Sequence, residues 1–139
     1  MAAYSSTPLI KKLGIKPASK VLLINEPPDY RKWLTENSND VFNANQLVKK
    51  NETPDVIHLF VKTNKEFEKE IKALNKYLKL NPGISIWVSW HKKAAKIPTD
   101  LTEDIIRNYA LTNGLVDIKV CSVSEEWSGL KLVVPLMKR

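Results

Sequence analysis

The sequence predicts a single-domain α/β protein with a mostly parallel sheet, helices on both faces and an antiparallel hairpin at its C-terminal end. Residues 20–24 and 55–61 are short runs dominated by apolar side chains, which is typical of strands buried on both faces. Segments with helix caps and apolar residues at helical spacing alternate with these strands. The last two apolar segments, residues 116–120 and 130–134, are joined by a turn, so we expect them to pair with each other.

Length and composition agree with this class. The chain has 139 residues, enough for one domain over residues 1–139, in which residues 1–19 form a capped helix and a lead-in. Its 43% hydrophobic and 27% charged residues are typical of a soluble globular protein. The four glycines and eight prolines follow no repeat, which excludes a collagen-like or low-complexity chain.

The N-terminal segment predicts a short helix followed by the first buried strand. Thr7 is suited to the N-cap, Pro8 to the first helical position and Gly14 to the position that ends the helix. Pro17 prevents the helix from continuing.

The connection to the second buried strand has a weaker pattern. Pro27 and Pro28 end the first strand, and Asp29 is suited to cap a short helix over residues 30–34. The rest of the connection predicts a loop over residues 35–40, a short strand over 41–44 and an ambiguous stretch over 46–52.

Two capping boxes mark the next helices. Thr63 with Glu66 predicts the start of the longest helix, over residues 64–80, and a third strand over residues 84–90 follows it. Asp100 with Glu103 predicts the start of a second helix. Gly114 ends that second helix, ahead of the C-terminal strands.

The charge and the cysteine content bound the function classes. The net charge is +7, but only three of the 22 basic residues are arginines, and lysine lacks the forked geometry that reads bases. Scattered surface lysine is therefore preferred over a nucleic-acid site. The single cysteine, Cys121, excludes an internal disulfide and suits a reducing compartment. With no signal peptide or membrane span in the sequence, we expect a cytoplasmic protein without membrane contact.

In a doubly wound sheet, ligands bind beyond the carboxyl ends of the parallel strands. Dinucleotide and S-adenosylmethionine sites use a glycine-rich turn after the first strand, where the ligand approaches the bare backbone. Here Pro27 and Pro28 occupy that turn, so we expect no nucleotide cofactor in the usual mode. The segments expected at this edge of the sheet are residues 25–28, 62–64 and 91–93.

The loop after the third strand offers the best candidate for binding. His91, Lys92, Lys93 and Lys96 lie just ahead of a predicted helix, whose N-terminus favours anions. Trp127, in a predicted turn and expected to be partly exposed, is a candidate anchor for a partner. These five residues are candidate contacts for an anionic group or an acidic protein surface. A solvated loop and a structural tryptophan are the alternative interpretation.

No catalytic or metal-binding set is recognisable. His58 lies inside a buried strand, where a hydrogen-bonded core histidine is expected. Ser128 lacks the glycine that a nucleophile elbow needs, since Glu126 stands at that position. Glu125 and Glu126 are adjacent and point apart in an extended chain, so they form no acid/base pair. The sequence weighs against an enzyme and predicts no cofactor and no metal.

The element order is Rossmann-like and resembles the closing half of class I methyltransferase folds, which also end in strand, helix, strand and antiparallel strand. Three stretches together resemble a bacterial family catalogued as a domain of unknown function, number three thousand and fifty-two. They read YSSTPL with KKLGIK, TDLTED, and VDIKVC with WSGLK. The resemblance implies a bacterial origin and a shared fold, and no reaction.

The leading hypothesis is a non-catalytic binding or regulatory module that recognises an anionic group or an acidic partner. One alternative is a degenerate methyltransferase-like enzyme with a non-standard pocket. The other is a non-specific nucleic-acid binder that uses its lysines.

Overall fold

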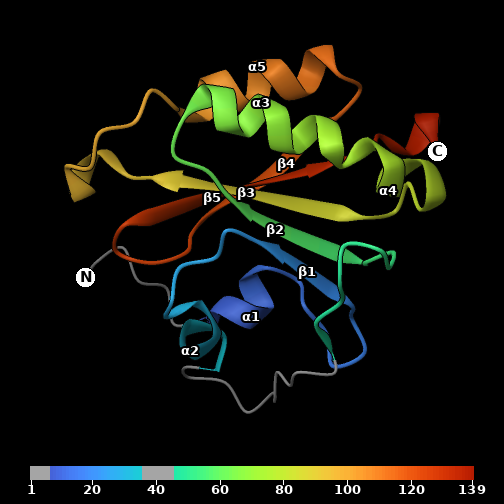
Figure 1. The fold of residues 1–139 in the computed structure, drawn as a ribbon, viewed down its shortest axis with the longest axis horizontal. Helices are drawn as coiled ribbons and strands as arrows, with labels where there is room; N and C mark the ends of the chain where they lie inside the picture. Colours follow the sequence, from blue (N-terminus) through green and yellow to red (C-terminus); the bar gives the residue numbers. More distant parts are fainter. Residues whose placement is uncertain (1–6, 36–45) are drawn as a thin grey trace.

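The computed structural model describes residues 7–35 and 46–139, which form one five-stranded sheet in the order β1-β2-β3-β5-β4 (Figure 1). β1, β2 and β3 run parallel, and β5 is antiparallel to both of its neighbours, β3 and β4. The strands are β1 (Val21–Ile24), β2 (Val56–Phe60), β3 (Ser85–His91), β4 (Val116–Ser122) and β5 (Trp127–Val133). The predicted Rossmann-like class is confirmed. The short strand predicted over residues 41–44 lies outside the described residues.

Helices cover both faces of the sheet (Figure 1). One layer consists of α3 (Asn64–Ala73), α4 (Asn75–Leu80) and α5 (Glu103–Thr112). The other consists of α1 (Leu9–Lys12) and α2 (Tyr30–Thr35), and two 3-10 turns, η2 (Lys93–Ala95) and η3 (Leu136–Lys138), complete the described elements. Each layer buries its own apolar core against the sheet, with Phe67 in the first core and Trp87 in the second.

The chain changes its direction across the sheet at β1. After α2 it forms a single parallel bridge between Leu47 and Val21, and it then pairs β2 with the other side of β1. Right-handed crossovers in opposite directions place their helices on opposite faces, which accounts for α2 on one face and α3 on the other. The point of reversal therefore lies at the carboxyl ends of β1 and β2, where open α/β sheets bind their ligands.

The first helix begins one residue later than predicted. Pro8, with its extended ψ of 146°, is the N-cap residue in place of Thr7, and the helix starts at Leu9. Its end agrees with the prediction, because Gly14 has a φ of +73°. The Ile15 N–H donates to the Ile10 carbonyl at 3.1 Å, which completes a Schellman motif.

The cap predicted at Asp100 is wrong. Thr102 is the N-cap of α5, and its hydroxyl accepts a hydrogen bond from the Ile105 N–H at 3.2 Å. Asp100 lies two residues too early for this role, because α5 starts at Glu103. Its carboxylate accepts instead from the Asn64 N–H at 2.7 Å, at the start of α3.

The helix predicted over residues 64–80 is divided into two. Its start is confirmed, since the Thr63 hydroxyl accepts from the Glu66 N–H at 3.1 Å. At Leu74 the hydrogen bonds shift to three-residue spacing, with Leu74 N–H on the Ile71 carbonyl and Tyr77 N–H on the Leu74 carbonyl. This tighter turn brings the Tyr77 side chain inward, where its hydroxyl donates to the backbone of residue 50.

The two tryptophans of β3, three positions apart, face opposite layers because successive side chains of a strand alternate between its faces. The Trp87 indole N–H donates to the Leu13 carbonyl at 2.9 Å and ties α1 to the sheet, whereas Trp90 packs in the other core. Gly129 of β5 provides the space for Trp87. A Cβ at Gly129 would lie 3.3 Å from the Trp87 ring and 3.0 Å from Val123.

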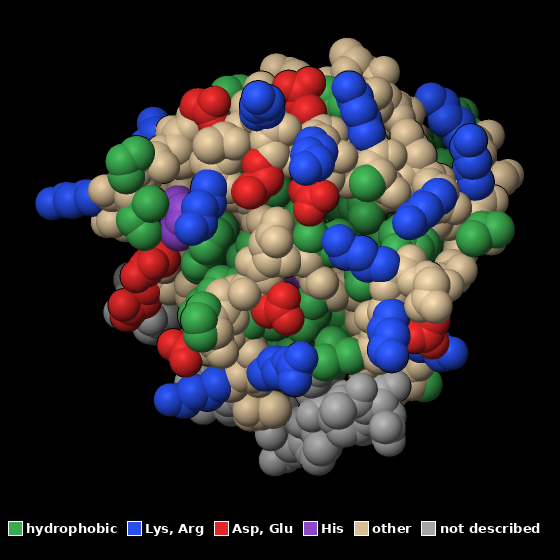
Figure 2. Space-filling view, viewed as in Figure 1, with side chains coloured by type: hydrophobic (Ala, Val, Ile, Leu, Met, Phe, Trp, Pro, Cys, Tyr) green, Lys and Arg blue, Asp and Glu red, His purple; other side chains and the backbone are tan. Residues whose placement is uncertain are grey.

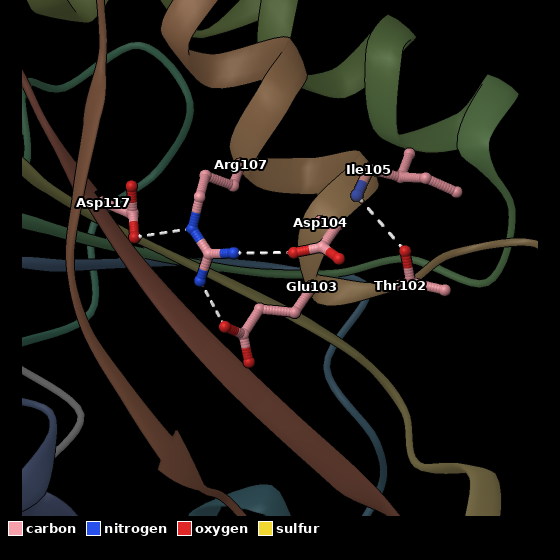
Figure 3. Close-up of polar contacts among 6 residues, drawn as sticks. All are labelled: Thr102, Glu103, Asp104, Ile105, Arg107 and Asp117. Carbon is pink, nitrogen blue, oxygen red and sulfur yellow. Dashed lines mark hydrogen bonds and ion pairs between the residues drawn. The ribbon is translucent and has the colours of Figure 1, made fainter.

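α5 is held against the edge strand β4 by Arg107 (Figure 3). Its Nε donates to Asp117 of β4 at 2.9 Å, and its terminal nitrogens pair with Asp104 and Glu103 on its own helix. The hydrogen bonds to Asp117 and Glu103 raise the pKa of the guanidinium. A bulge follows Asp117 in the pairing of β4 with β5, where the register shifts before Lys119.

Candidate functional site

A pocket of about 650 Å³ opens at the carboxyl ends of the parallel strands, at the point where the chain reverses its direction across the sheet. Figure 2 shows apolar surface recessed among charged side chains at the left of the view, where these strand ends lie. The three segments expected at this edge each contribute to it. The lining residues are Asn25, Glu26, Pro27, Pro28, Phe60, Lys62, Glu66, His91, Ile97, Glu126 and Trp127.

Aromatic rings form the apolar part of the pocket. The His91 and Trp127 rings are tilted by 32° with their centroids 3.9 Å apart, and Phe60 meets Trp127 edge to face at 5.0 Å. Trp127 is 7% exposed, so the expectation of a partly exposed turn residue is wrong. It begins β5 directly opposite His91, and this pairing holds it against its neighbours.

His91 carries a buried polar atom that lacks a partner. The side chain is 5% exposed, and its Nδ1 makes no hydrogen bond within the described part of the chain. A buried nitrogen without a partner is unfavourable, and such atoms in native structures concentrate where a water, an ion or a ligand completes the site.

Acidic side chains outnumber basic ones around the pocket. Glu26, Glu66 and Glu126 line it, against the single ammonium group of Lys62. One Glu66 oxygen accepts from the Lys62 N–H at 2.8 Å, so this carboxylate is partly engaged with the backbone at the start of α3. The pocket therefore favours a positively charged ligand over an anion.

The turn after β1 has a backbone that sequence reasoning missed. Asn25 has a φ of +59°, in the left-handed region that glycine adopts most easily. Asparagine tolerates this region better than most residues, and an asparagine between a buried strand and two prolines is the signal from which the turn could have been inferred. After Asn25, a second turn is closed by the Tyr30 N–H, which donates to the Pro27 carbonyl at 3.1 Å.

Behind the pocket, three buried polar side chains form a continuous chain. His58 Nδ1 lies 2.6 Å from the Tyr30 hydroxyl, and its Nε2 lies 2.7 Å from the Ser89 hydroxyl. The predicted hydrogen-bonded core histidine is confirmed. Burial lowers the pKa of His58 to about 3 and raises the pKa of Tyr30 well above its usual value, so both groups are neutral. The His58 ring stacks on Phe60 at 4.3 Å and supports the pocket from below.

The candidate residues from the basic loop divide into two groups. His91 and Trp127 meet in the pocket, whereas Lys92, Lys93 and Lys96 do not line it. The Lys92 ammonium donates to the Ser122 hydroxyl at 2.6 Å, at the end of β4. Lys93 and Lys96 are exposed in and after η2. An anion contact at these lysines stays a prediction.

In residues 7–35 and 46–139, no group of three or more histidine, cysteine, aspartate or glutamate side chains is placed to hold a metal ion. None of the helices described is long and apolar enough to cross a lipid bilayer.

Several solved structures of other proteins superpose on this fold. An S-adenosylmethionine-dependent methyltransferase from Aquifex aeolicus superposes with a TM-score of 0.62 at 17% identity, over 96% of this chain and 91% of that one. A protein of the NADB-Rossmann superfamily from Streptococcus agalactiae gives 0.53 at 11% identity, over 94% and 69%. The tRNA methyltransferase TrmK of B. subtilis gives 0.52 at 11% identity, over 96% and 68%.

At these identities the similarity concerns the fold alone. No protein-family profile and no curated protein sequence matches the chain. The resemblance of its motifs to the bacterial family of unknown function therefore stays a prediction.

Proposed function

We propose that this protein is a non-catalytic binding module whose ligand occupies the pocket at the carboxyl ends of β1, β2 and β3 and combines a flat ring with a positive charge. The observation that carries the proposal is the aromatic surface of His91, Trp127 and Phe60 beside three carboxylates. Flat rings stack on such a surface, and cations are attracted both to aromatic faces and to carboxylates.

The ligand proposed for the pocket has the opposite charge to the anionic ligand that the sequence predicts. The sequence favours an anionic group or an acidic partner, on the evidence of the lysines near residue 92. The pocket has the opposite charge balance, with three glutamates against Lys62. An anion would meet net repulsion there, so recognition of anions belongs to another surface of the molecule.

Three adenosine compounds test the proposal, since they share a ring and differ in charge. S-adenosylmethionine carries a sulfonium, S-adenosylhomocysteine lacks it, and adenosine monophosphate is an anion. We expect affinity to fall in that order, with shifts of the Trp127 indole signal in the NMR spectrum, which a Trp127→Phe variant assigns. Equal affinity for all three, or no shift at Trp127 with any of them, would contradict the proposal.

Charge variants sharpen this test. Glu26→Gln and Glu126→Gln keep the shape of the side chain and remove a charge at the pocket. Each should weaken the binding of S-adenosylmethionine by up to about tenfold and leave the affinity for S-adenosylhomocysteine unchanged. Glu70→Gln removes the same charge from α3 outside this pocket and serves as the matched control.

A degenerate methyltransferase-like enzyme with a non-standard pocket is the second candidate function. The superposition on the Aquifex aeolicus methyltransferase, over 96% of this chain, favours it. Pro27 and Pro28 argue against this second function, because they remove backbone donors from the turn after β1. Incubation with S-adenosylmethionine and a mixture of acceptor molecules distinguishes the two, because only the enzyme releases S-adenosylhomocysteine faster than the protein-free mixture.

Membership of the bacterial family and a cytoplasmic location complete the proposal. Both rest on the sequence, through the three motif stretches and the single cysteine. Fractionation of bacterial cells that produce the tagged chain checks the location, with the soluble cytoplasmic fraction as the expected result.

A further inference from the structure

Four lysines that are far apart in the sequence gather on the α1 side of the sheet, next to the edge strand β4. They are Lys12 of α1, Lys92 after β3, Lys119 of β4 and Lys131 of β5, and we call them the lysine cluster. The Lys119 ammonium donates to the Lys12 carbonyl at 3.3 Å, which places β4's side chain at the end of α1. A Cβ on Gly14, just after α1, would lie 3.9 Å from the Lys131 ammonium.

Two members of the cluster form an unfavourable cross-strand pair. Lys119 and Lys131 lie directly opposite each other where β4 pairs with β5. Side chains in this relation have Cβ atoms roughly 5 Å apart, and like charges there are destabilising. The bulge after Asp117 sets this register, so the two charges are opposed by the detailed pairing of the strands.

Lys92 lies close enough to Lys12 for the two charges to interact. Its ammonium donates to the Ser122 hydroxyl at the end of β4. Partial burial and the neighbouring charge of Lys12 lower the pKa of Lys92, and partial burial and the charge of Lys119 lower the pKa of Lys131. The positive charges of Lys92 and Lys131 are therefore held at a cost in free energy.

The described residues provide little neutralisation of these charges. All three ion pairs within residues 7–35 and 46–139 involve Arg107, which lies on α5 in the other layer. Glu125, in the β4–β5 turn, acts on Lys92 through its charge and opposes the lowering of its pKa. One carboxylate does not balance four ammonium groups.

We propose that the lysine cluster binds a compact anion that carries at least two negative charges, of the pyrophosphate class. The ammonium groups of Lys119 and Lys131 then contact the anion from β4 and β5, Lys12 lies beside them at the end of α1, and Lys92 adds its charge from the turn after β3. Charge-assisted hydrogen bonds to phosphate oxygens are among the stronger polar contacts in proteins. The bound anion relieves the repulsion between Lys119 and Lys131, so binding stabilises the folded chain.

The close pairing of Lys119 with Lys131 favours a small anion over a polymer. A nucleic-acid backbone is contacted along a stripe of basic residues. Here the next side chain along β4 on the face of Lys119 is that of Cys121, which packs against the α1-side core, and the acidic Glu125 lies in the turn beyond. The site lies on surface separate from the pocket, whose lining contains none of the four lysines.

Titration of the protein with pyrophosphate tests this proposal. The variant Lys119→Gln/Lys131→Gln removes two charges from the cluster, and Lys72→Gln/Lys79→Gln removes two exposed charges from α3 and α4 in the other layer. We expect pyrophosphate to bind the first variant at least about tenfold more weakly than the unaltered protein, and the control within about twofold. Backbone NMR signals of residues 12, 119 and 131 should shift.

Three outcomes would overturn the proposal. Equal weakening in both variants would show a response to net charge alone. Sodium chloride at the same ionic strength producing the same shifts would show screening and no binding. A short single-stranded oligonucleotide that binds at these residues more tightly than pyrophosphate would assign the surface to nucleic acid instead. Loss of the pocket ligand in Glu126→Gln leaves this result unchanged, so the two proposals fail separately.

Discussion

The Tyr30 hydroxyl and Nδ1 of His58 lie 2.6 Å apart in a part of the core where neither side chain is exposed to solvent. The opposite ring nitrogen contacts the Ser89 hydroxyl at 2.7 Å. A neutral imidazole has one donor and one acceptor, and a hydroxyl can be either, so all the polar atoms of this chain are paired. The contact joins α2 to β2 and β3 beneath the pocket.

Removal of one hydroxyl from this chain should be costly. Tyr30→Phe leaves Nδ1 of His58 buried and unpaired, which we expect to lower the free energy of unfolding by about 1–3 kcal/mol. Urea unfolding measures it. Tyr109→Phe is the matched control, because the Tyr109 hydroxyl is buried with no partner in the described part of the chain and its removal should be neutral or stabilising. Equal losses in both variants would contradict the pairing.

The same histidine predicts a dependence of stability on pH. Burial lowers the pKa of His58 from 6.5 to about 3, so between these values the unfolded chain binds a proton that the folded chain excludes. The free energy of unfolding therefore falls as the pH drops from about 6.5 toward 3, by up to about 1.4 kcal/mol per pH unit from this group.

A variant isolates that contribution. His58→Gln lacks the titrating group, so the stability difference between it and the unaltered protein should shrink by about 2–3 kcal/mol between roughly pH 7 and pH 4.5. Denaturant unfolding at both pH values measures the difference. If the difference is the same at both, His58 does not carry the dependence.

Gly129 tests the packing of Trp87 against β5. A Cβ at this position would lie 3.0 Å from Val123 and 3.3 Å from the Trp87 ring, so Gly129→Ala should destabilise the protein by about 1–3 kcal/mol. At Gly83 the nearest atom is the Asn81 side-chain oxygen at 3.2 Å, which is able to move. Gly83→Ala should therefore be tolerated, and thermal unfolding of the two variants compares them directly.

Thr102 tests the corrected start of α5. Its hydroxyl is the only side-chain acceptor described for the Ile105 N–H, so Thr102→Ala should lower the free energy of unfolding by about 1 kcal/mol. Thr53, exposed in the connection ahead of β2, is the control, and Thr53→Ala should have little effect. A larger loss at Thr53 than at Thr102 would refute the assignment of the cap.

Several elements are determined by local chemistry, and the sequence predicts them well. The strands β1, β2 and β3 follow from apolar runs that stay buried whichever elements cover them. Gly14 and Gly114 end helices because each adopts a positive φ at no steric cost. The cap at Thr63 is likewise a contact over three residues, which a spacing rule captures.

What the sequence by itself determined is thus the α/β class, the strand ends at which a ligand is expected and the burial of His58. Only the tertiary structure decided that His91 and Trp127 share a pocket with three glutamates. It also decided that Lys92 bonds to Ser122 instead, and that Lys119 meets both Lys12 and Lys131. The hydrogen bond from Lys119 to the Lys12 carbonyl alone joins residues 107 positions apart. Such contacts depend on the order and register of the strands. A local sequence pattern relates only residues that are close along the chain, so it contains neither the order nor the register.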